Sequence, residues 1–164
     1  MAYGVRTLKR THKTDSFHSG SDVLDDWLRT TARQHQKKGI SKTYVLIDDG
    51  APDSILGFFT LAIRKMMPRE ALPVDIAKRL PRSVPCYTLA RLAVAKELHG
   101  QGFGESLLVR ALQKARAAAI KVGGVAVFVD AKDVATAEFY KAHGFAPTRA
   151  DPLVLSIAIN NIPD

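Results

Sequence analysis

The chain has 164 residues, a length typical of one domain with a buried core. Hydrophobic residues make up 46% and charged residues 24%, which excludes a disordered or fibrous protein. Lys and Arg number 24 against 16 acids, a formal net charge of +8.

The positive charge is unevenly distributed along the chain. Residues 1–43 contain nine Lys or Arg and four acids, and residues 64–82 contain six and two. A basic surface can serve solubility alone. The clustering favours a polyanionic partner.

The first twenty residues lack the apolar core and cleavage site of a secretory signal, and no stretch approaches the length of a membrane span. We therefore expect a cytoplasmic protein with no membrane partner. Cys86 is the only cysteine, which excludes an intramolecular disulfide and a thiolate metal cluster. A buried strand position is favoured for it over a nucleophile, because its flanks show no histidine partner.

A strand and a helix open the chain. Residues 5–10, "VRTLKR", predict the strand, and cap residues in 19–22 precede an amphipathic helix over 23–38 that ends at a glycine. Trp27 and Leu28 share the apolar face of this helix. They are expected to pack in the core rather than form an exposed stripe for a partner.

A hairpin and a proline-bracketed excursion follow. Residues 42–50 and 54–65 predict antiparallel strands joined through a turn at 48–50. Four prolines then bracket a short helix over 74–80.

The remainder alternates strands and helices. Residues 86–94 and 124–131 are nearly continuous apolar runs, typical of strands buried on both faces. Helices are expected over 104–121 and in the segment 136–145, where Gly144 stops the helix, and a last strand over 153–159. The pattern predicts an α/β protein, or α+β, around one mixed sheet.

Gly100, Gly102 and Gly104 stand between the predicted strand and the helix that follows it. Glycine lets the backbone adopt positive φ and approach a ligand, and the N-terminus of a helix after such a loop suits a phosphate. The Gly-Lys-Ser/Thr end of the Walker loop is missing, and the glycine spacing differs from the dinucleotide fingerprint. A tight turn without a ligand is the alternative.

Two motifs resemble those of the GCN5-related N-acetyltransferase (GNAT) family. His99-x-x-Gly102-x-Gly104 is similar to the family's Gln/Arg-x-x-Gly-x-Gly/Ala motif, and "DVATAEFYKAHGF" (133–145) to its Asn-x-x-Ala-x-x-x-Tyr-x-x-x-Gly-Phe segment. The resemblance implies a single GNAT domain over 1–164. Its expected fold is a mixed, mostly antiparallel sheet flanked by helices, with splayed strands that hold acetyl-CoA and with no metal.

The resemblance also implies the site residues. Those that contact acetyl-CoA are Leu92, Ala93, Val94, His99, Gly100, Gln101, Gly102, Phe103, Gly104 and Glu105. Tyr140 matches the tyrosine that protonates the departing thiolate in the family. Without the family, a tyrosine beside Phe139 on an amphipathic helix is more often a core residue with a polar tip. His99 replaces the usual Gln or Arg.

No side chain is evident as the general base. Asp130, Asp133 and Glu138 lie near the second motif, but each is equally typical of a solvated acid at a helix start. An α-amine, with a pKa near ~8, is already partly neutral at neutral pH, whereas a lysine amine near ~10.4 needs help to lose its proton. We therefore infer an α-amino substrate.

Segments 20–48, 57–62, 89–108 and 138–145 further resemble acetyltransferase toxins of type II toxin–antitoxin pairs. This resemblance implies acetylation of the α-amine of aminoacyl-tRNA, inhibition of translation, neutralisation by a ribbon-helix-helix antitoxin, and a homodimer. The alternatives are acetylation of small amines or protein N-termini, and a non-catalytic basic module that binds nucleic acid.

Four basic residues are candidates for contact with tRNA or substrate: Arg91, Lys37, Lys38 and Lys42. Arg91 stands out because an arginine inside an apolar strand requires a partner. A structural salt bridge is an equal explanation for it. The lysines are equally typical of a solvated surface.

Overall fold

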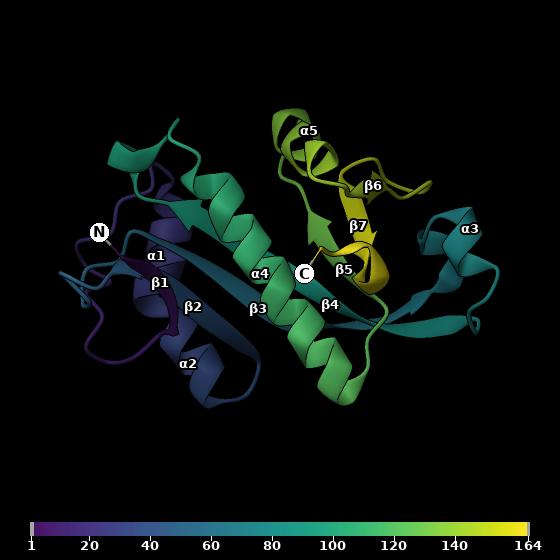
Figure 1. The fold of residues 1–164 in the computed structure, drawn as a ribbon, viewed down its shortest axis with the longest axis horizontal. Coiled ribbons are helices and arrows are strands. Elements are labelled where there is room, and N and C mark those ends of the chain that lie inside the picture. Colours follow the sequence, from purple (N-terminus) through teal and green to yellow (C-terminus); the bar gives the residue numbers. More distant parts are fainter. Residues whose placement is uncertain (1, 164) are drawn as a thin grey trace. The chain divides into compact units, whose positions relative to one another are not determined.

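A computed structural model describes residues 2–163, and its strands form one seven-stranded mixed sheet in the order β1-β2-β3-β4-β5-β7-β6 (Figure 1). The contacts divide the chain into two compact units. The first unit comprises the residues up to Ala62 together with Ala90–Ala111, and the second comprises Ile63–Leu89 and the residues from Leu112 onward. Strands β3 and β4 and helix α4 contribute residues to both. The α/β class with a mixed sheet is confirmed.

The strands are β1 (Tyr3–Thr7), β2 (Ser41–Asp48), β3 (Gly57–Pro68), β4 (Ser83–Val94), β5 (Ala126–Asp130), β6 (Ala146–Pro147) and β7 (Val154–Ala158). The helices are α1 (Asp22–Thr30), α2 (Ala32–Lys37), α3 (Val74–Ala77), α4 (Phe103–Val122) and α5 (Val134–Ala142). Strands β4 and β5 pair in parallel, whereas β1–β2, β2–β3, β5–β7 and β6–β7 are antiparallel. Each predicted strand is present. The two-residue β6 was not predicted, because it is too short to carry a pattern.

The prediction of one helix over 23–38 is wrong, since the segment forms α1 and α2 with a break at Thr31. The Thr31 backbone leaves the helical region, with φ −125° and ψ −34°. One residue earlier, the Thr30 hydroxyl donates to the Asp26 carbonyl at 2.7 Å. Threonine side chains that bond to the preceding turn in this way disturb a helix, which accounts for the break.

The core of the first unit lies between its strands and helices. In Figure 1, α1 and α2 lie behind β1 and β2. Leu28 is fully buried in a cluster with Val45 and Phe58, and the ring of Trp27 stacks on Phe58 with centroids 6.4 Å apart. The predicted core role of Trp27 and Leu28 is confirmed.

The core of the second unit gathers Phe128 of β5, Val84 of β4 and apolar residues of the excursion around α3. Cys86 belongs to this cluster, and burial raises the pKa of its thiol to about 11. This agrees with the prediction of a buried strand position. None of the helices in the described part of the chain is long and apolar enough to cross a bilayer.

A buried hydroxyl pair in the first unit gives a test of the β2–β3 register. Thr43 and Thr60 are both inaccessible to solvent, and their hydroxyls share a 2.8 Å hydrogen bond. Thr43→Val should lower the free energy of unfolding by about 1–3 kcal/mol, because it strands the Thr60 hydroxyl in the core. Adding Thr60→Val should recover most of that loss, since both polar groups are then gone. Urea unfolding of the two single variants and the double variant measures this, and additive losses would contradict the pairing.

Candidate functional site

The glycine loop joins the end of β4 to the start of α4 within the first unit. Gly100 and Gly102 have φ of +77° and +84°, and an added Cβ would meet no atom within 4 Å at either position. Their backbone conformation, rather than crowding, therefore requires glycine. Gly104 lies in the first turn of α4 without a positive φ, and also has open space around it.

The side chain of His99 forms a hydrogen bond between this loop and the strand before it. Its Nε2 lies 2.8 Å from the Val94 carbonyl oxygen. A carbonyl can only accept, so Nε2 is the donor in this hydrogen bond. His99 therefore acts on the position of the loop, and it needs no permanent charge to do so.

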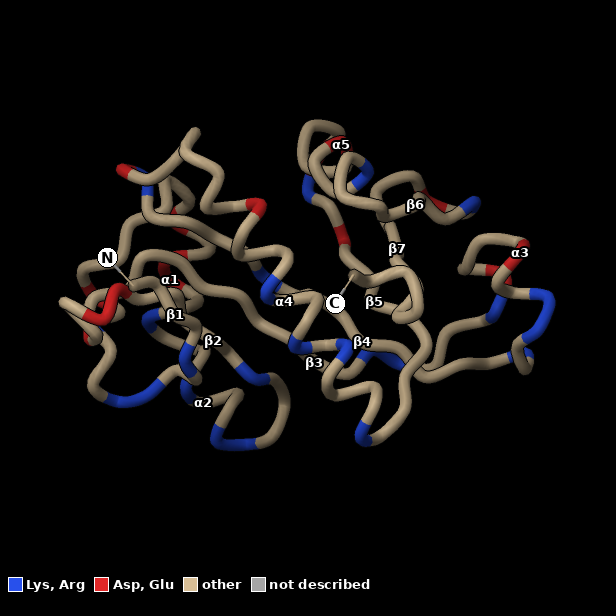
Figure 2. The backbone as a smooth tube through the Cα atoms, in the orientation of Figure 1, with Lys and Arg blue, Asp and Glu red and all other residues tan. Residues whose placement is uncertain are grey.

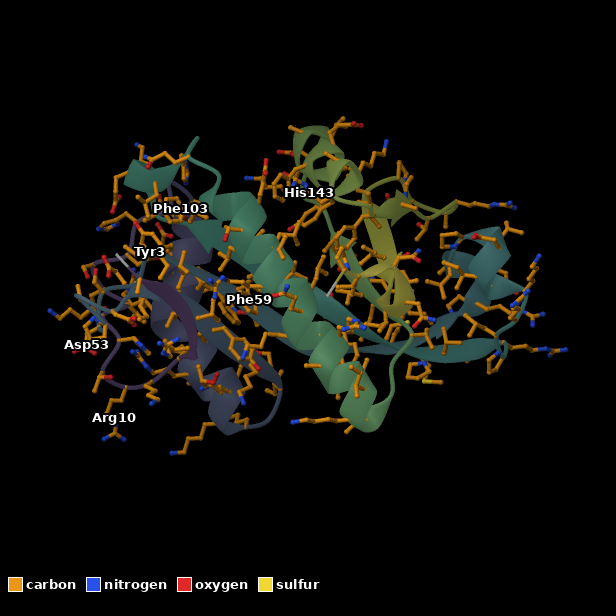
Figure 3. All side chains as sticks on the ribbon, in the orientation of Figure 1. Tyr3, Arg10, Asp53, Phe59, Phe103 and His143 are labelled. Carbon is orange, nitrogen blue, oxygen red and sulfur yellow. The ribbon has the colours of Figure 1, made fainter. Side chains whose placement is uncertain are left out.

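The start of α4 presents main-chain donors beside the loop. The Ser106 amide donates to the Gly102 carbonyl at 3.1 Å, so the amides of Phe103 and Gly104 precede the first helical bond. The Phe103 ring packs edge-on against Tyr3 with centroids 5.3 Å apart, which anchors this end of the helix (Figure 3). Unpaired amides at a helix start form a site for an anion.

Close packing fixes the end of β4. A Cβ on Gly57 would lie 3.0 Å from the Ala93 carbonyl oxygen and 3.2 Å from a methyl of Leu107. The Ala95 amide donates to the Leu56 carbonyl at 2.8 Å. Ala93 and Val94 are buried, and Leu92 is partly buried. The strand that leads into the glycine loop is thus held by main-chain contact with β3 and the segment before it.

Arg91 lies on the same strand and stacks on Trp27, with its guanidinium carbon 4.2 Å from the ring centroid. Within residues 2–163 its one hydrogen bond runs from Nη1 to the Ala90 carbonyl at 3.5 Å, and it forms no ion pair there. Burial lowers the pKa of the guanidinium. The aromatic face stabilises the cation and leaves most of its N–H donors available. This Arg91–Trp27 contact was not predicted, because sequence spacing does not show which ring covers a cation.

The three candidate lysines differ from the partly buried Arg91, because all three are exposed. Lys37 ends α2, Lys38 follows it, and both are exposed. Lys42 is exposed on β2, with its ammonium 5.8 Å from the centroid of the Tyr44 ring. Figure 2 shows basic positions along α2 and along the loop between β1 and α1.

Tyr140 belongs to the second unit and is buried on α5. Its ring contacts Phe139 and Phe145 edge-on, with both centroid distances 5.2 Å. Burial raises the pKa of its hydroxyl to about 12. Within residues 2–163 the hydroxyl has no hydrogen-bond partner. It is a neutral phenol with its proton available.

Each candidate base in the second unit has a structural contact. Asp130 accepts two hydrogen bonds from the Arg64 guanidinium, at 2.9 and 3.0 Å. Asp133 caps α5 by accepting from the Thr136 amide at 2.8 Å, and hydrogen bonding to Thr136 lowers its pKa.

The third candidate, Glu138, pairs with Lys141 at 3.2 Å on the exposed face of α5. No group of three His, Cys, Asp or Glu residues in the described chain could hold a metal ion.

Comparison with known proteins gives this geometry a context. Residues 39–147 match the model of a family described as an acetyltransferase (GNAT) domain. The tRNA-acetylating toxin of Mycobacterium tuberculosis is 31% identical over 156 residues, which covers 95% of this chain and 92% of that protein.

Two solved structures extend the likeness to the fold. One is AtaT complexed with acetyl-methionyl-tRNAfMet, at 27% identity and a TM-score of 0.90, covering 98% of this chain and 97% of that one. The other is a tyrosine-to-phenylalanine variant of AtaT bound to the C-terminus of the antitoxin AtaR and acetyl-CoA. It shares 25% identity at a TM-score of 0.81, covering 98% of this chain and 95% of that one.

The loop glycines give a matched pair of substitutions. Gly102→Ala should lower the free energy of unfolding by about 1 kcal/mol, because its positive φ is strained for any residue with a Cβ. Gly104→Ala should be neutral or stabilise by up to about 1 kcal/mol, since alanine favours the helix at this position. Thermal unfolding of both variants checks this, and equal effects at the two positions would contradict the assigned loop conformation.

Proposed function

Because the chain belongs to the acetyltransferase (GNAT) domain family, we propose that it transfers the acetyl group of acetyl-CoA to the α-amine of the amino acid on charged tRNA, and thereby inhibits translation as a toxin. The observation that carries the proposal is the likeness to a tRNA-acetylating toxin over 95% of the chain. The structure of AtaT with an acetylated aminoacyl-tRNA supports the same substrate class.

In this proposal the glycine loop and the start of α4 hold the phosphates of acetyl-CoA. The main chain of Gly100–Glu105 approaches them, since Gly100 and Gly102 leave open space, and the helix start supplies amide donors. His99 keeps the loop in place through the Val94 carbonyl. The main chain of 92–94 is assigned to the pantetheine arm and the thioester.

Acetyl transfer forms a C–N bond to the amine and breaks the C–S bond of the thioester. The amine attacks in its neutral form, and its extra proton passes to solvent after attack. Tyr140 donates its phenolic proton to the departing thiolate and regains a proton from solvent, a role consistent with its raised pKa and with a hydroxyl that has no hydrogen-bond partner within residues 2–163. An α-amine needs little assistance to become neutral, and the three nearby carboxylates already have structural contacts.

Arg91 is assigned to the substrate side of the reaction. A cation that stacks on Trp27 and forms no ion pair within residues 2–163 suits a phosphate of tRNA near its aminoacylated end. Lys37, Lys38 and Lys42 are assigned to its phosphate backbone, where exposed lysines bind without reading sequence.

The proposed partner is an antitoxin with a ribbon-helix-helix half, supported by the complex of AtaT with the C-terminus of AtaR. The proposal also includes a homodimer and a cytoplasmic location, where charged tRNA is found. The whole chain is proposed to act as one acetyltransferase domain, since the family match spans residues of both units.

Transfer of labelled acetyl from acetyl-CoA to total charged tRNA tests the function. Label should appear on charged tRNA and not on deacylated tRNA. Tyr140→Phe should lower the rate by about 10²- to 10⁴-fold, the usual contribution of a general acid. Tyr87→Phe is the matched control, since it removes a tyrosine hydroxyl that donates to the Gly123 carbonyl in the same unit.

Three results would contradict this proposal, and each would have a different meaning. Label on polyamines or protein N-termini alone would assign a different acceptor. Binding of acetyl-CoA with no label on any acceptor would leave a non-catalytic module. Full activity in Tyr140→Phe would remove the tyrosine from the mechanism.

The raised pKa of Tyr140 predicts the alkaline side of the pH profile. We expect kcat/KM to rise through about pH 8 as the α-amine loses its proton, then to stay level past about pH 10, where an ordinary tyrosine would ionise. The acid form persists because burial raises its pKa to about 12. Initial rates from about pH 7 to about pH 10.5 measure this. A fall to half by about pH 10 would show an unshifted hydroxyl.

A further inference from the structure

A basic hollow of about 500 Å³ lies in the first unit beside the loop between β1 and α1. Its cationic lining comes from Arg10, Lys13, Arg29 and Arg33, and the hydroxyls of Thr14 and Ser16 also line it. We propose that this hollow binds a backbone phosphate of tRNA, as a contact separate from the residues assigned to acetyl transfer. The inference rests on the proposed function and adds a docking site to it.

Arg33 makes the hollow rigid. Its guanidinium donates to the carbonyls of Lys9 and His12 at 3.1 and 2.6 Å, and to the Thr14 hydroxyl at 3.4 Å. The Gln36 amide donates to the Leu8 carbonyl at 2.9 Å in support. Side chains of α2 therefore hold the loop in one conformation. Because carbonyl groups carry no net charge, the positive charge of Arg33 is not neutralised by these bonds.

The remaining charges leave the hollow positive. Arg29 is hydrogen-bonded to Asp26, and Asp15 is the acidic residue in the lining. Arg10 and Lys13 are exposed, and neither forms an ion pair within residues 2–163. Two exposed cations on a loop held by hydrogen bonds from α2 are thus available to an anion.

The donor set suits a phosphate. Guanidinium, ammonium and hydroxyl donors can each contact a different oxygen of a tetrahedral phosphodiester, and such contacts position a nucleic acid without reading its sequence. The hollow is also separate from the glycine loop, since Arg10 and Phe103 lie at different edges of the first unit in Figure 3. A long polyanion can reach both places at once, whereas a small acceptor amine cannot. This favours tRNA as the occupant.

The salt dependence of tRNA binding tests the proposal. The double variant Arg10→Gln/Lys13→Gln should weaken binding of deacylated tRNA by about 10-fold and reduce the slope of log K against log salt by about 1 to 2. The matched control is Arg79→Gln/Lys78→Gln, which removes the same charges from exposed positions of the second unit. The control should keep the affinity and the slope of the unmodified chain. Binding of acetyl-CoA should be unchanged in both.

Three results would overturn the proposal: an unchanged slope in the first variant, an equal change in the control pair, or a loss of binding to anionic lipid vesicles with tRNA binding intact. Failure of the proposed function has a different signature, because the unmodified chain would then place no label on charged tRNA. Arg33 is left unchanged, since its loss would loosen the loop itself.

Discussion

The hydrogen bond between His99 and the Val94 carbonyl is the contact on which the candidate site depends. It ties the loop after β4 back to the strand that precedes it, while Gly100 and Gly102 provide the positive φ values that the return requires. With the loop fixed, the first amides of α4 are aimed at one place. His99 can therefore stand where Gln or Arg is usual in the family, because its observed contact positions the backbone of the loop.

Residue patterns within single segments were sufficient to predict most of the helices and strands. Alternating and continuous apolar runs predicted the longer strands, and glycines and prolines marked their ends. The break at Thr31 was missed, because a threonine can continue a helix or bond back to the preceding turn, and tertiary packing decides between them. The strand β6 was missed because two residues carry no periodicity.

The backbone conformation of the glycine loop was predictable, because glycine spacing indicates where the chain adopts positive φ. Side-chain partners were not predictable, because they depend on contacts between distant parts of the chain. The same residue type has three roles here. Arg33 holds a loop through carbonyls, Arg64 pairs with Asp130, and Arg91 stacks on the ring of Trp27. Counting basic residues along the sequence indicates a polyanionic partner but cannot separate these roles.

The burial of Cys86 has a consequence for a chain that handles an activated acyl group. A thioester exchanges readily with any accessible thiolate, so an exposed cysteine would accept acetyl groups and divert them from the amine. The single thiol of this chain is enclosed in the core of the second unit and ionises only near pH 11. Burial of Cys86 therefore keeps the protein's own thiol from competing with the amine for the acetyl group.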